Sequence, residues 1–173
     1  MSETFRIEPL GERHDRAGFT SGSEILDRYF RTQASQDVRR RIATCFVAVS
    51  QGTEEIAGYY TLSAASVALS PQSVALSPQV VKKLPRYPVV PGALLGRLAV
   101  ARSHQGIALG SVLVADALKR TARAEMGVFA MIVNAKDESA QRFYERYGFT
   151  LLTGEARRLI LPIDAALRKL ALR

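Results

Sequence analysis

The chain has 173 residues, 47% of them hydrophobic, a composition typical of a folded globular protein that buries a sizeable core. Its formal net charge of +8 supports a polyanionic partner without identifying one. The single cysteine, Cys45, excludes an internal disulfide and a cysteine-rich zinc site, and its apolar surroundings favour a buried, unreactive thiol. The N-terminus lacks the layout of a signal peptide and no apolar run approaches about 18 residues, so we expect a cytoplasmic protein with no membrane partner.

The first half of the chain predicts two strands on either side of a turn, preceded by a strand and a helix. Phe5–Pro9 forms the first strand. Ser23 caps a helix whose apolar residues recur at helical spacing as far as Val38. Thr44–Ser50 and Ile56–Ser63 form a hairpin around a short polar turn.

The second half alternates strands and helices. Ala93–Ala101 reads as a central strand buried on both faces, and a helix begins near Leu109 with Val112 on its buried stripe. Val128–Val133 is a further buried strand. The remaining expected elements are a helix from Asp137 to Tyr147 stopped by Gly148, strands near Phe149 and at Arg158–Leu161, and a last short helix capped by Asp164. This order predicts one mixed α/β domain over residues 1–173.

A seven-residue segment, Ser66–Gln72, is repeated without change as Ser73–Gln79. Two copies of this length are too few and too short for a repeat architecture. We expect a surface loop lengthened by duplication, because a longer flexible loop costs only about half a kcal/mol.

A turn of small residues, Gln105–Gly110, joins the central strand to the helix that follows. Such a turn aims backbone N–H groups and the positive end of a helix dipole at one point, which suits a pyrophosphate. It is not a P-loop, because no Gly-Lys-Ser/Thr follows, and its glycines do not match the dinucleotide fingerprint. Taken alone, the hexapeptide also fits an ordinary strand-to-helix turn; the second strand–helix unit beyond it favours the phosphate site.

The arrangement resembles the GNAT superfamily of acetyl-CoA-dependent N-acetyltransferases, whose pyrophosphate loop follows the pattern Gln/Arg-x-x-Gly-x-Gly/Ala. Gln105 and Gly110 match the ends of the pattern, and Ala108 replaces its middle glycine. The resemblance implies a central mixed, mostly antiparallel sheet flanked by helices, with an acetyl-CoA cleft between the two central strands. Six further segments carry a narrower pattern: Gly22 with Leu26–Asp27, Gly58–Ser63, Leu84–Pro88, Gly96–Val100, Asn134–Lys136 and Phe143–Glu145. Together they resemble the GNAT toxins of type II toxin–antitoxin operons.

For those toxins the resemblance implies a defined reaction and defined partners. They acetylate the α-amino group of the amino acid on a charged elongator tRNA, which stops translation. A ribbon-helix-helix antitoxin from the same operon neutralises the toxin, and the toxin meets operator DNA only through that complex. The toxins are commonly dimeric, so we expect aminoacyl-tRNA, an antitoxin and a second copy of the chain as partners.

The resemblance also assigns site residues. Tyr144 stands at the family's position for the proton donor to the departing thiolate, although a tyrosine flanked by Phe143 and Tyr147 also fits a core aromatic. Backbone N–H groups of the central strand can hold the cofactor arm and polarise the acetyl carbonyl. The residues expected at acetyl-CoA are Leu98, Ala99, Val100, Gln105, Gly106, Ile107, Ala108, Leu109, Gly110, Ser111 and Asn134. If the turn needs a positive φ at Ala108, alanine costs about 1 kcal/mol relative to glycine there.

Arginine supplies most of the positive charge, since only five of the 24 basic residues are lysines. Its planar fork suits phosphate oxygens and stacked bases, but a GC-rich genome explains the bias equally well. Contacts with tRNA are expected at Arg39, Arg40, Arg41, Arg86 and Arg97. The first three equally fit a solvated face, whereas Arg97 lies in an apolar motif and is expected to need an anionic partner.

The two histidines do not suggest a metal site, because no cluster of suitable ligands surrounds either of them. His14 is expected in solvent, and His104 directly precedes the turn. Two other functions fit the sequence. One is a GNAT that acetylates a protein N-terminus or a small amine, although the positive charge disfavours a polyamine. The other is a catalytically weak GNAT-fold module that binds its antitoxin and acts as a corepressor.

Overall fold

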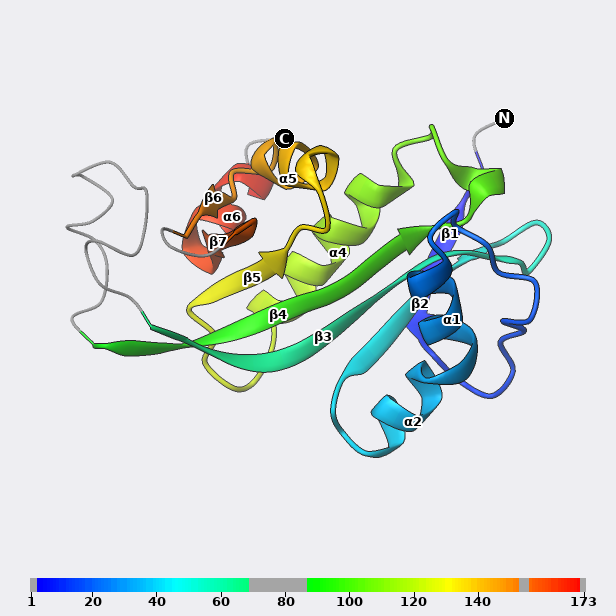
Figure 1. Cartoon of the computed structure of the whole chain (residues 1–173), viewed down its shortest axis with the longest axis horizontal. Coiled ribbons are helices and arrows are strands. Elements are labelled where there is room, and N and C mark those ends of the chain that lie inside the picture. The colour runs from blue at the N-terminus through cyan, green and yellow to red at the C-terminus, as the bar shows by residue number, and fades with distance from the viewer. Residues whose placement is uncertain (1–2, 69–86, 153–155, 172–173) are drawn as a thin grey trace. The chain divides into compact units, whose positions relative to one another are not determined.

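A computed structural model describes residues 3–68, 87–152 and 156–171. The described strands form a seven-stranded sheet in the order β1-β2-β3-β4-β5-β7-β6 (Figure 1). The β1–β2, β2–β3, β5–β7 and β6–β7 pairs are antiparallel, which confirms the expected mixed α/β fold with a mostly antiparallel sheet. The strands are β1 (Phe5–Pro9), β2 (Thr44–Ser50), β3 (Ile56–Ala68), β4 (Val89–Val100), β5 (Ala130–Asn134), β6 (Thr150–Leu151) and β7 (Arg158–Pro162). The helices are α1 (Glu24–Thr32), α2 (Ala34–Arg39), the 3-10 turn η1 (Arg102–His104), α4 (Leu109–Ala122), α5 (Glu138–Glu145) and α6 (Ile163–Ala171).

The chain forms two compact units. The first consists of Met1–Ser63 and Leu95–Ala117, and the second of Ala64–Leu94 and Leu118–Arg173. The strands β3 and β4 and the helix α4 contribute residues to both units.

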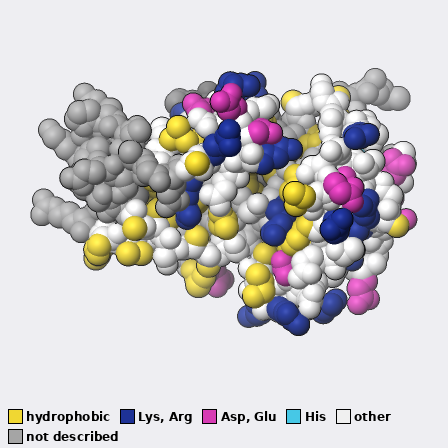
Figure 2. All heavy atoms as spheres, viewed as in Figure 1, with side chains coloured by type: hydrophobic (Ala, Val, Ile, Leu, Met, Phe, Trp, Pro, Cys, Tyr) yellow, Lys and Arg dark blue, Asp and Glu magenta, His cyan; other side chains and the backbone are white. Residues whose placement is uncertain are grey.

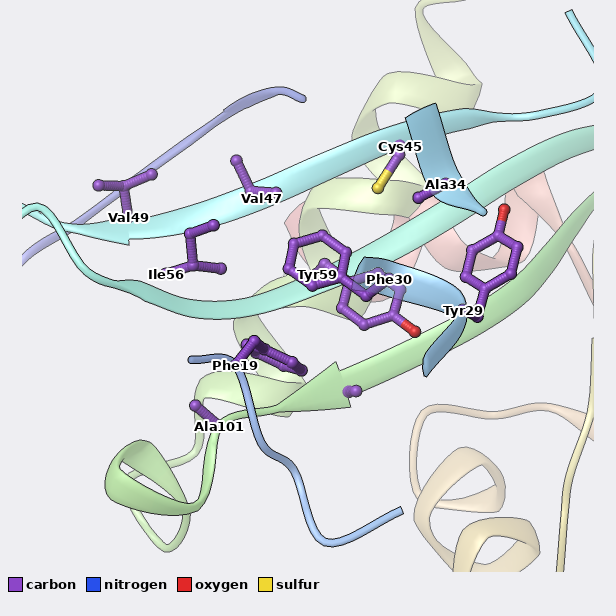
Figure 3. Close-up of a cluster of buried hydrophobic side chains, with 11 residues drawn as sticks. Phe19, Tyr29, Phe30, Ala34, Cys45, Val47, Val49, Ile56, Tyr59 and Ala101 are labelled. Carbon is purple, nitrogen blue, oxygen red and sulfur yellow. The ribbon is translucent and has the colours of Figure 1, made fainter. Parts of the chain in front are cut away.

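In the first unit, α1 and α2 pack onto one face of β2 and β3 (Figure 3). The Phe30 and Tyr59 rings stack with their centroids 4.2 Å apart, and Phe19 meets both rings edge-on. The Tyr59 hydroxyl donates a hydrogen bond to the backbone oxygen of Leu26 (2.7 Å), so this buried polar group is satisfied. Cys45 lies in the same cluster, as expected, and burial raises the pKa of its thiol to about 12.

The opposite face of the same strands receives α4. Side chains alternate along a strand, so Gly58 and Tyr60 point away from Tyr59. A Cβ at Gly58 would lie 2.9 Å from the backbone oxygen of Ala99 and 3.1 Å from Leu113 of α4, so the missing side chain permits the close approach. The buried Tyr60 hydroxyl donates to the Asp116 carboxylate of α4 at 2.5 Å. A backbone contact and a buried hydrogen bond therefore fix α4 against β3.

A β-bulge in β3 serves the end of β4. The β2–β3 register shifts between Ala48 and Val49, which makes Ala57 an additional residue in β3. The backbone oxygen of Ala57 then accepts a hydrogen bond from the Ala101 amide at 2.8 Å. This bond holds the chain where β4 ends and η1 begins.

The second unit has its own core. In β5 and β7 the register pairs Ile132 with Ile160, and both side chains are buried with Val67 of β3 and Val90 of β4. Gly92 lies in this core, where a Cβ would approach Val67 to 3.0 Å. Helix α5 starts as expected, since the Asp137 carboxylate caps it by accepting from the Ala140 amide at 2.8 Å. It ends before Gly148, whose φ is +97°.

The single helix expected after Ser23 is two helices. Helix α1 ends at Thr32, and Gln33, with φ −118° and ψ −31°, separates it from α2. The break lets the Asp37 carboxylate accept hydrogen bonds from the Tyr29 hydroxyl (2.8 Å) and from the Gln33 amide (3.1 Å). A side-chain network thus overrides the continuous apolar periodicity that predicted one helix.

Three other expectations differ from the structure. Strand β3 continues to Ala68 and takes in the first three residues of the duplicated segment, with Val67 buried, so the expected surface loop is wrong there; the rest of the duplication lies outside the described residues. Val112 is 48% exposed and lies off the buried stripe of α4. Asp164 lies inside the first turn of α6, which already begins at Ile163.

His14 is not in solvent, which corrects another expectation: its side chain is 5% exposed. The Gly11 amide donates to His14 Nδ1 at 2.9 Å, and His14 Nε2 lies 2.8 Å from a Glu8 carboxylate oxygen. Arg6 and Arg13 also contact Glu8. Hydrogen bonds from Arg6, and then from His14, lower the pKa of Glu8 to about 2.

This cluster predicts a specific acid dependence of stability. Because the folded-state pKa of Glu8 is depressed, its contribution is present above the unfolded value of about 4.3 and is lost as the pH falls toward about 2. We expect Glu8→Gln to lower the urea midpoint at pH 7, and the gap from wild type to close between pH 5 and pH 2. Glu12→Gln, an exposed carboxylate in the next loop, is the matched control and should show no such gap. A gap that stays constant across this range would contradict the assignment.

Candidate active site

The turn expected to bind a pyrophosphate begins where β4 ends. The chain leaves Val100, passes through η1 and enters α4 at Leu109, which is 2% exposed and anchors the helix in the first unit. Residues 105–108 are all exposed. Gly106 has φ +83° and Ala108 has φ +63°, so two residues of the turn occupy the left-handed region. The turn is therefore an exposed loop with an unusual backbone, mounted on a buried strand and a buried helix start.

The residues present fit a pyrophosphate. Helix α4 has 14 residues, its first turn contains Gly110 and Ser111 and no acidic residue, and its N-terminal N–H groups lack intrahelical partners. No atom lies within 4 Å of the position that a Cβ on Gly106 would take, so the backbone is open to a ligand there. An anion at this point would meet free N–H groups and the positive end of the helix dipole.

The Gln105 side chain joins two segments of the protein. Its side-chain nitrogen Nε2 donates to the backbone oxygen of Ser21 at 2.7 Å and to that of Val100 at 3.0 Å. Both amide protons are therefore used inside the protein. Sequence analysis placed Gln105 at the cofactor but missed Ser21, whose position 84 residues earlier gave no local signal.

Ser21 is in turn held by Asp27, another residue that the site prediction omitted. The Ser21 amide lies 3.0 and 3.1 Å from the two Asp27 carboxylate oxygens, and the Ser21 hydroxyl lies 2.6 Å from one of them. Between them, Gly22 has φ +98°, and a Cβ there would lie 3.3 Å from the Arg102 side chain of η1. The loop before α1 is thus packed directly against the segment that leads into the turn.

His104 is buried at the end of η1. Its Nε2 lies 3.1 Å from a Glu3 carboxylate oxygen, its Nδ1 lies 2.8 Å from the Ser103 hydroxyl, and its ring meets Phe5 edge-on. Both ring nitrogens therefore have protein partners. Among the described residues, no group of three or more histidine, cysteine or acidic side chains could hold a metal ion. Within the same residues, no helix is long and apolar enough to cross a membrane.

Arg97 contacts an aromatic ring where an anionic partner was expected. Its side chain is partly buried, and its guanidinium carbon lies 3.5 Å from the centroid of the Tyr29 ring. The Tyr29 hydroxyl donates to Asp37, and the Arg97 charge helps to lower the pKa of that carboxylate after the hydrogen bonds from Gln33 and Tyr29. A half-buried guanidinium needs less compensation than a fully buried one, and the aromatic face supplies part of it, while an anionic partner of Arg97 stays a prediction.

The other arginines expected at tRNA lie apart from this stack. Arg39, Arg40 and Arg41 are exposed at the end of α2, and Figure 2 shows basic side chains gathered along that edge of the first unit. Arg41 has φ +60°, which turns the chain back toward β2. Arg86 lies outside the described residues.

Tyr144 and Asn134 belong to the second unit. Tyr144 on α5 is 8% exposed and packs edge-on against Phe143 and Phe149. Burial alone raises the pKa of its phenol well above the usual value, so the hydroxyl stays protonated at neutral pH. No hydrogen bond to that hydroxyl occurs within the described part of the chain. Asn134 is exposed at the end of β5, where it pairs with Arg158 of β7.

The turn provides a direct test of backbone strain. Ala108 already has a positive φ without ligand. Ala108→Gly removes the penalty for a left-handed alanine but increases the entropy of the unfolded chain, so we expect the free energy of unfolding to rise by about 0.5–1 kcal/mol and the thermal midpoint to rise with it. We also expect acetyl-CoA to bind several-fold more tightly by calorimetry, because a methyl group leaves the exposed turn. Gly106→Ala is the reciprocal control: it meets no atom within 4 Å and should destabilise through φ alone. A lower midpoint for Ala108→Gly would contradict the strain.

Comparison with known proteins agrees with the fold and with the position of the turn. A family profile described as "Acetyltransferase (GNAT) domain" matches residues 91–159, which include β4 from Pro91 onward, the turn, α4 and α5. The "tRNA-acetylating toxin" of Mycobacterium tuberculosis (strain ATCC 25618 / H37Rv) is 33% identical over 159 residues, which cover 91% of each chain.

Solved structures of the toxin AtaT are similar over nearly the whole length. AtaT complexed with acetyl-methionyl-tRNAfMet matches with a TM-score of 0.83 and 29% identity, covering 98% of this chain and 100% of that one. A mutant of AtaT bound to the C-terminus of the antitoxin AtaR and acetyl-CoA matches with a TM-score of 0.78 and 27% identity, covering 96% and 98%. With a curated relative at this identity over nine-tenths of both chains, the protein belongs to the GNAT acetyltransferases and is similar to a member named as a tRNA-acetylating toxin.

Proposed function

We propose that this protein transfers the acetyl group of acetyl-CoA to the α-amino group of aminoacyl-tRNA and so blocks translation, as the toxin of a type II toxin–antitoxin pair. The observation that carries the proposal is the similarity along 91% of the chain to a protein named for tRNA acetylation. The AtaT complex with an acetylated aminoacyl-tRNA supports it.

The first unit provides the groups that bind acetyl-CoA. The exposed amides of Gly106–Ala108 and the first turn of α4, including Gly110 and Ser111, hold the pyrophosphate. The backbone of Leu98–Val100, at the end of β4, holds the pantetheine arm and polarises the acetyl carbonyl. Leu109 fixes the start of the helix, and Ile107 offers an exposed apolar contact. Asn134 of β5, in the second unit, is proposed separately as a cofactor contact.

Tyr144 donates the last proton. The amine forms its bond to the acetyl carbon and releases a proton to solvent, while the carbon–sulfur bond breaks and the departing thiolate takes the Tyr144 proton; Tyr144 then regains a proton from solvent. A phenol with a raised pKa keeps its proton at neutral pH, and low-dielectric surroundings also make a thiolate more basic. The attacking amine must be neutral, and an α-amino group has a pKa well below that of a lysine side chain, so it supplies the neutral form more readily.

The proposed tRNA contacts rest on charge and geometry. Arg39–Arg41 offer three exposed cations at the end of α2, where phosphates can reach them, and Arg86 belongs to the same proposed set. Arg97 is different, because its guanidinium carbon lies 3.5 Å from the centroid of the Tyr29 ring and the side chain is only partly buried, so contact with the ring holds a cation that a phosphate can approach.

The proposal extends to partners. The structural relative bound to its antitoxin supports an antitoxin that binds this toxin. A ribbon-helix-helix antitoxin, contact with operator DNA through that complex, and a homodimer in the cytoplasm complete the proposal. The competing functions, acetylation of another amine or a catalytically weak binding module, are separated from it by the two experiments below.

Tyr144→Phe removes one hydroxyl and keeps the ring that packs on Phe149. General acid assistance is typically worth on the order of 10² to 10⁴ in rate, so we expect kcat to fall at least about 100-fold with acetyl-CoA affinity nearly unchanged. Tyr147→Phe removes a hydroxyl from the turn just after α5 and is the matched control. A Tyr144→Phe enzyme that keeps more than half of the wild-type turnover would exclude Tyr144 from the mechanism.

The substrate itself is tested with charged and uncharged tRNA. Acetylation should require the amino acid on the tRNA. The affinity for tRNA should fall steeply with salt, and the slope of log affinity against log salt concentration should become shallower by about one for each phosphate contact removed at Arg39–Arg41. Arg97→Lys keeps the positive charge but loses the contact of the planar guanidinium with Tyr29, so it should weaken tRNA use more than acetyl-CoA binding. Arg123→Ala, which removes one positive charge elsewhere, is the control for the effect of net charge. Acetylation of free amino acids or peptides at rates equal to those with tRNA and indifferent to salt would favour the small-amine enzyme.

A further inference from the structure

We propose that Asp27 is a positioning residue for acetyl-CoA binding, which aligns the turn at residues 105–108 by acting through Ser21 and Gln105. The inference rests on the proposed binding of acetyl-CoA at that turn. It assigns a role to a buried carboxylate that lies on α1, 78 positions before the turn in the chain.

The first step concerns why Asp27 holds the loop before α1 so firmly. Its carboxylate is 3% exposed, and a buried charge is stable only when hydrogen-bonded. Ser21 supplies those bonds through its amide to both oxygens (3.0 and 3.1 Å) and through its hydroxyl at 2.6 Å. Hydrogen bonds to an ionised acceptor are about twice as strong as neutral ones. The position and orientation of Ser21 are therefore fixed by Asp27.

The second step carries this constraint to the turn. The backbone oxygen of Ser21 points at Gln105 Nε2 and accepts its hydrogen bond at 2.7 Å. The same nitrogen donates to Val100, so the Gln105 side chain bridges the loop before α1 and the end of β4. A second contact runs in parallel, because the Arg102 amide donates to the backbone oxygen of Thr20 at 2.8 Å.

The third step is that the turn has little else to hold it. Residues 105–108 are exposed, and no atom surrounds the Cβ position of Gly106 within 4 Å. Ala108 occupies the left-handed region, which is unfavourable for alanine and persists only where the surroundings impose it. Hydrogen bonds at Gln105 are thus a main restraint on the strained backbone whose amides face the ligand. Without the carboxylate at 27, we expect the free turn to relax and to present its amides less favourably.

Asp27→Asn tests the proposal. The amide puts a donor where one carboxylate oxygen accepted from Ser21, with little change in volume. We expect the Kd and KM for acetyl-CoA to rise about fivefold to tenfold, with kcat at saturating acetyl-CoA within about twofold of wild type. Asp37→Asn is the matched control: Asp37 also accepts two side-chain hydrogen bonds near α1 but has no bond to the loop or the turn, so acetyl-CoA affinity should stay within about twofold.

A double-mutant cycle separates positioning from general destabilisation. Gln105→Met removes both bridging hydrogen bonds, so in that background Asp27→Asn should change acetyl-CoA affinity no further. Equal effects of Asp27→Asn in both backgrounds, or an unchanged Kd in the wild-type background, would overturn the inference. If Asp27→Asn does not fold, Ser21→Ala, which deletes only the hydroxyl bond, is carried through the same cycle with the same criteria. A wild-type protein that binds no acetyl-CoA would refute the proposed function, whereas normal wild-type binding with no effect at Asp27 refutes the positioning role alone.

Discussion

The first unit depends on the close approach of α4 to the β3–β4 pair at Gly58. A side chain there would come within 2.9 Å of the Ala99 backbone oxygen, so no larger residue fits without moving the strand or the helix. The same stretch of β3 contains the bulge at Ala57, whose oxygen holds Ala101 at the end of β4. Together they determine where the helix dipole begins and in which direction the turn leaves the strand. Backbone packing at Gly58 and Ala57 therefore sets where α4 starts and where the turn leaves the strand.

Local patterns in the sequence predicted the elements well, because each depends on neighbours a few residues away. β2 has the predicted bounds, Thr44–Ser50, since a short apolar run between polar residues leaves few alternatives. The break at Gln33 could not be predicted in the same way. It depends on the hydrogen bonds that Asp37 accepts from Tyr29 and Gln33, and a periodic apolar stripe carries no information about them. His14 gives the same lesson, because its burial follows from Glu8 on β1.

In the candidate site, too, the features that depend on local sequence could be predicted and those that depend on long-range contacts could not. The location of the turn followed from the small residues after an apolar strand, whereas the positive φ at Ala108 was only a conditional expectation until the structure gave it. The partner of Gln105 could not be predicted, because Ser21 lies 84 residues earlier in the chain. Asp27 contacts Ser21 and so acts on Gln105 only indirectly. The partner of Arg97 was sought among anions, whereas the fold supplies the face of Tyr29. A motif locates a functional segment, and long-range packing decides what its side chains do.

Tyr144 shows what the structure adds to a motif. Four tyrosines are buried in the described residues, and three of them have hydroxyls that the fold uses: Tyr29 donates to Asp37, Tyr59 to Leu26 and Tyr60 to Asp116. Among the same residues, Tyr144 is the buried tyrosine whose hydroxyl makes no such bond, and burial still raises its pKa. A hydroxyl that serves the core already donates its hydrogen bond to a fixed acceptor. One left without a partner in an apolar setting keeps that proton available, as a donor to a thiolate requires.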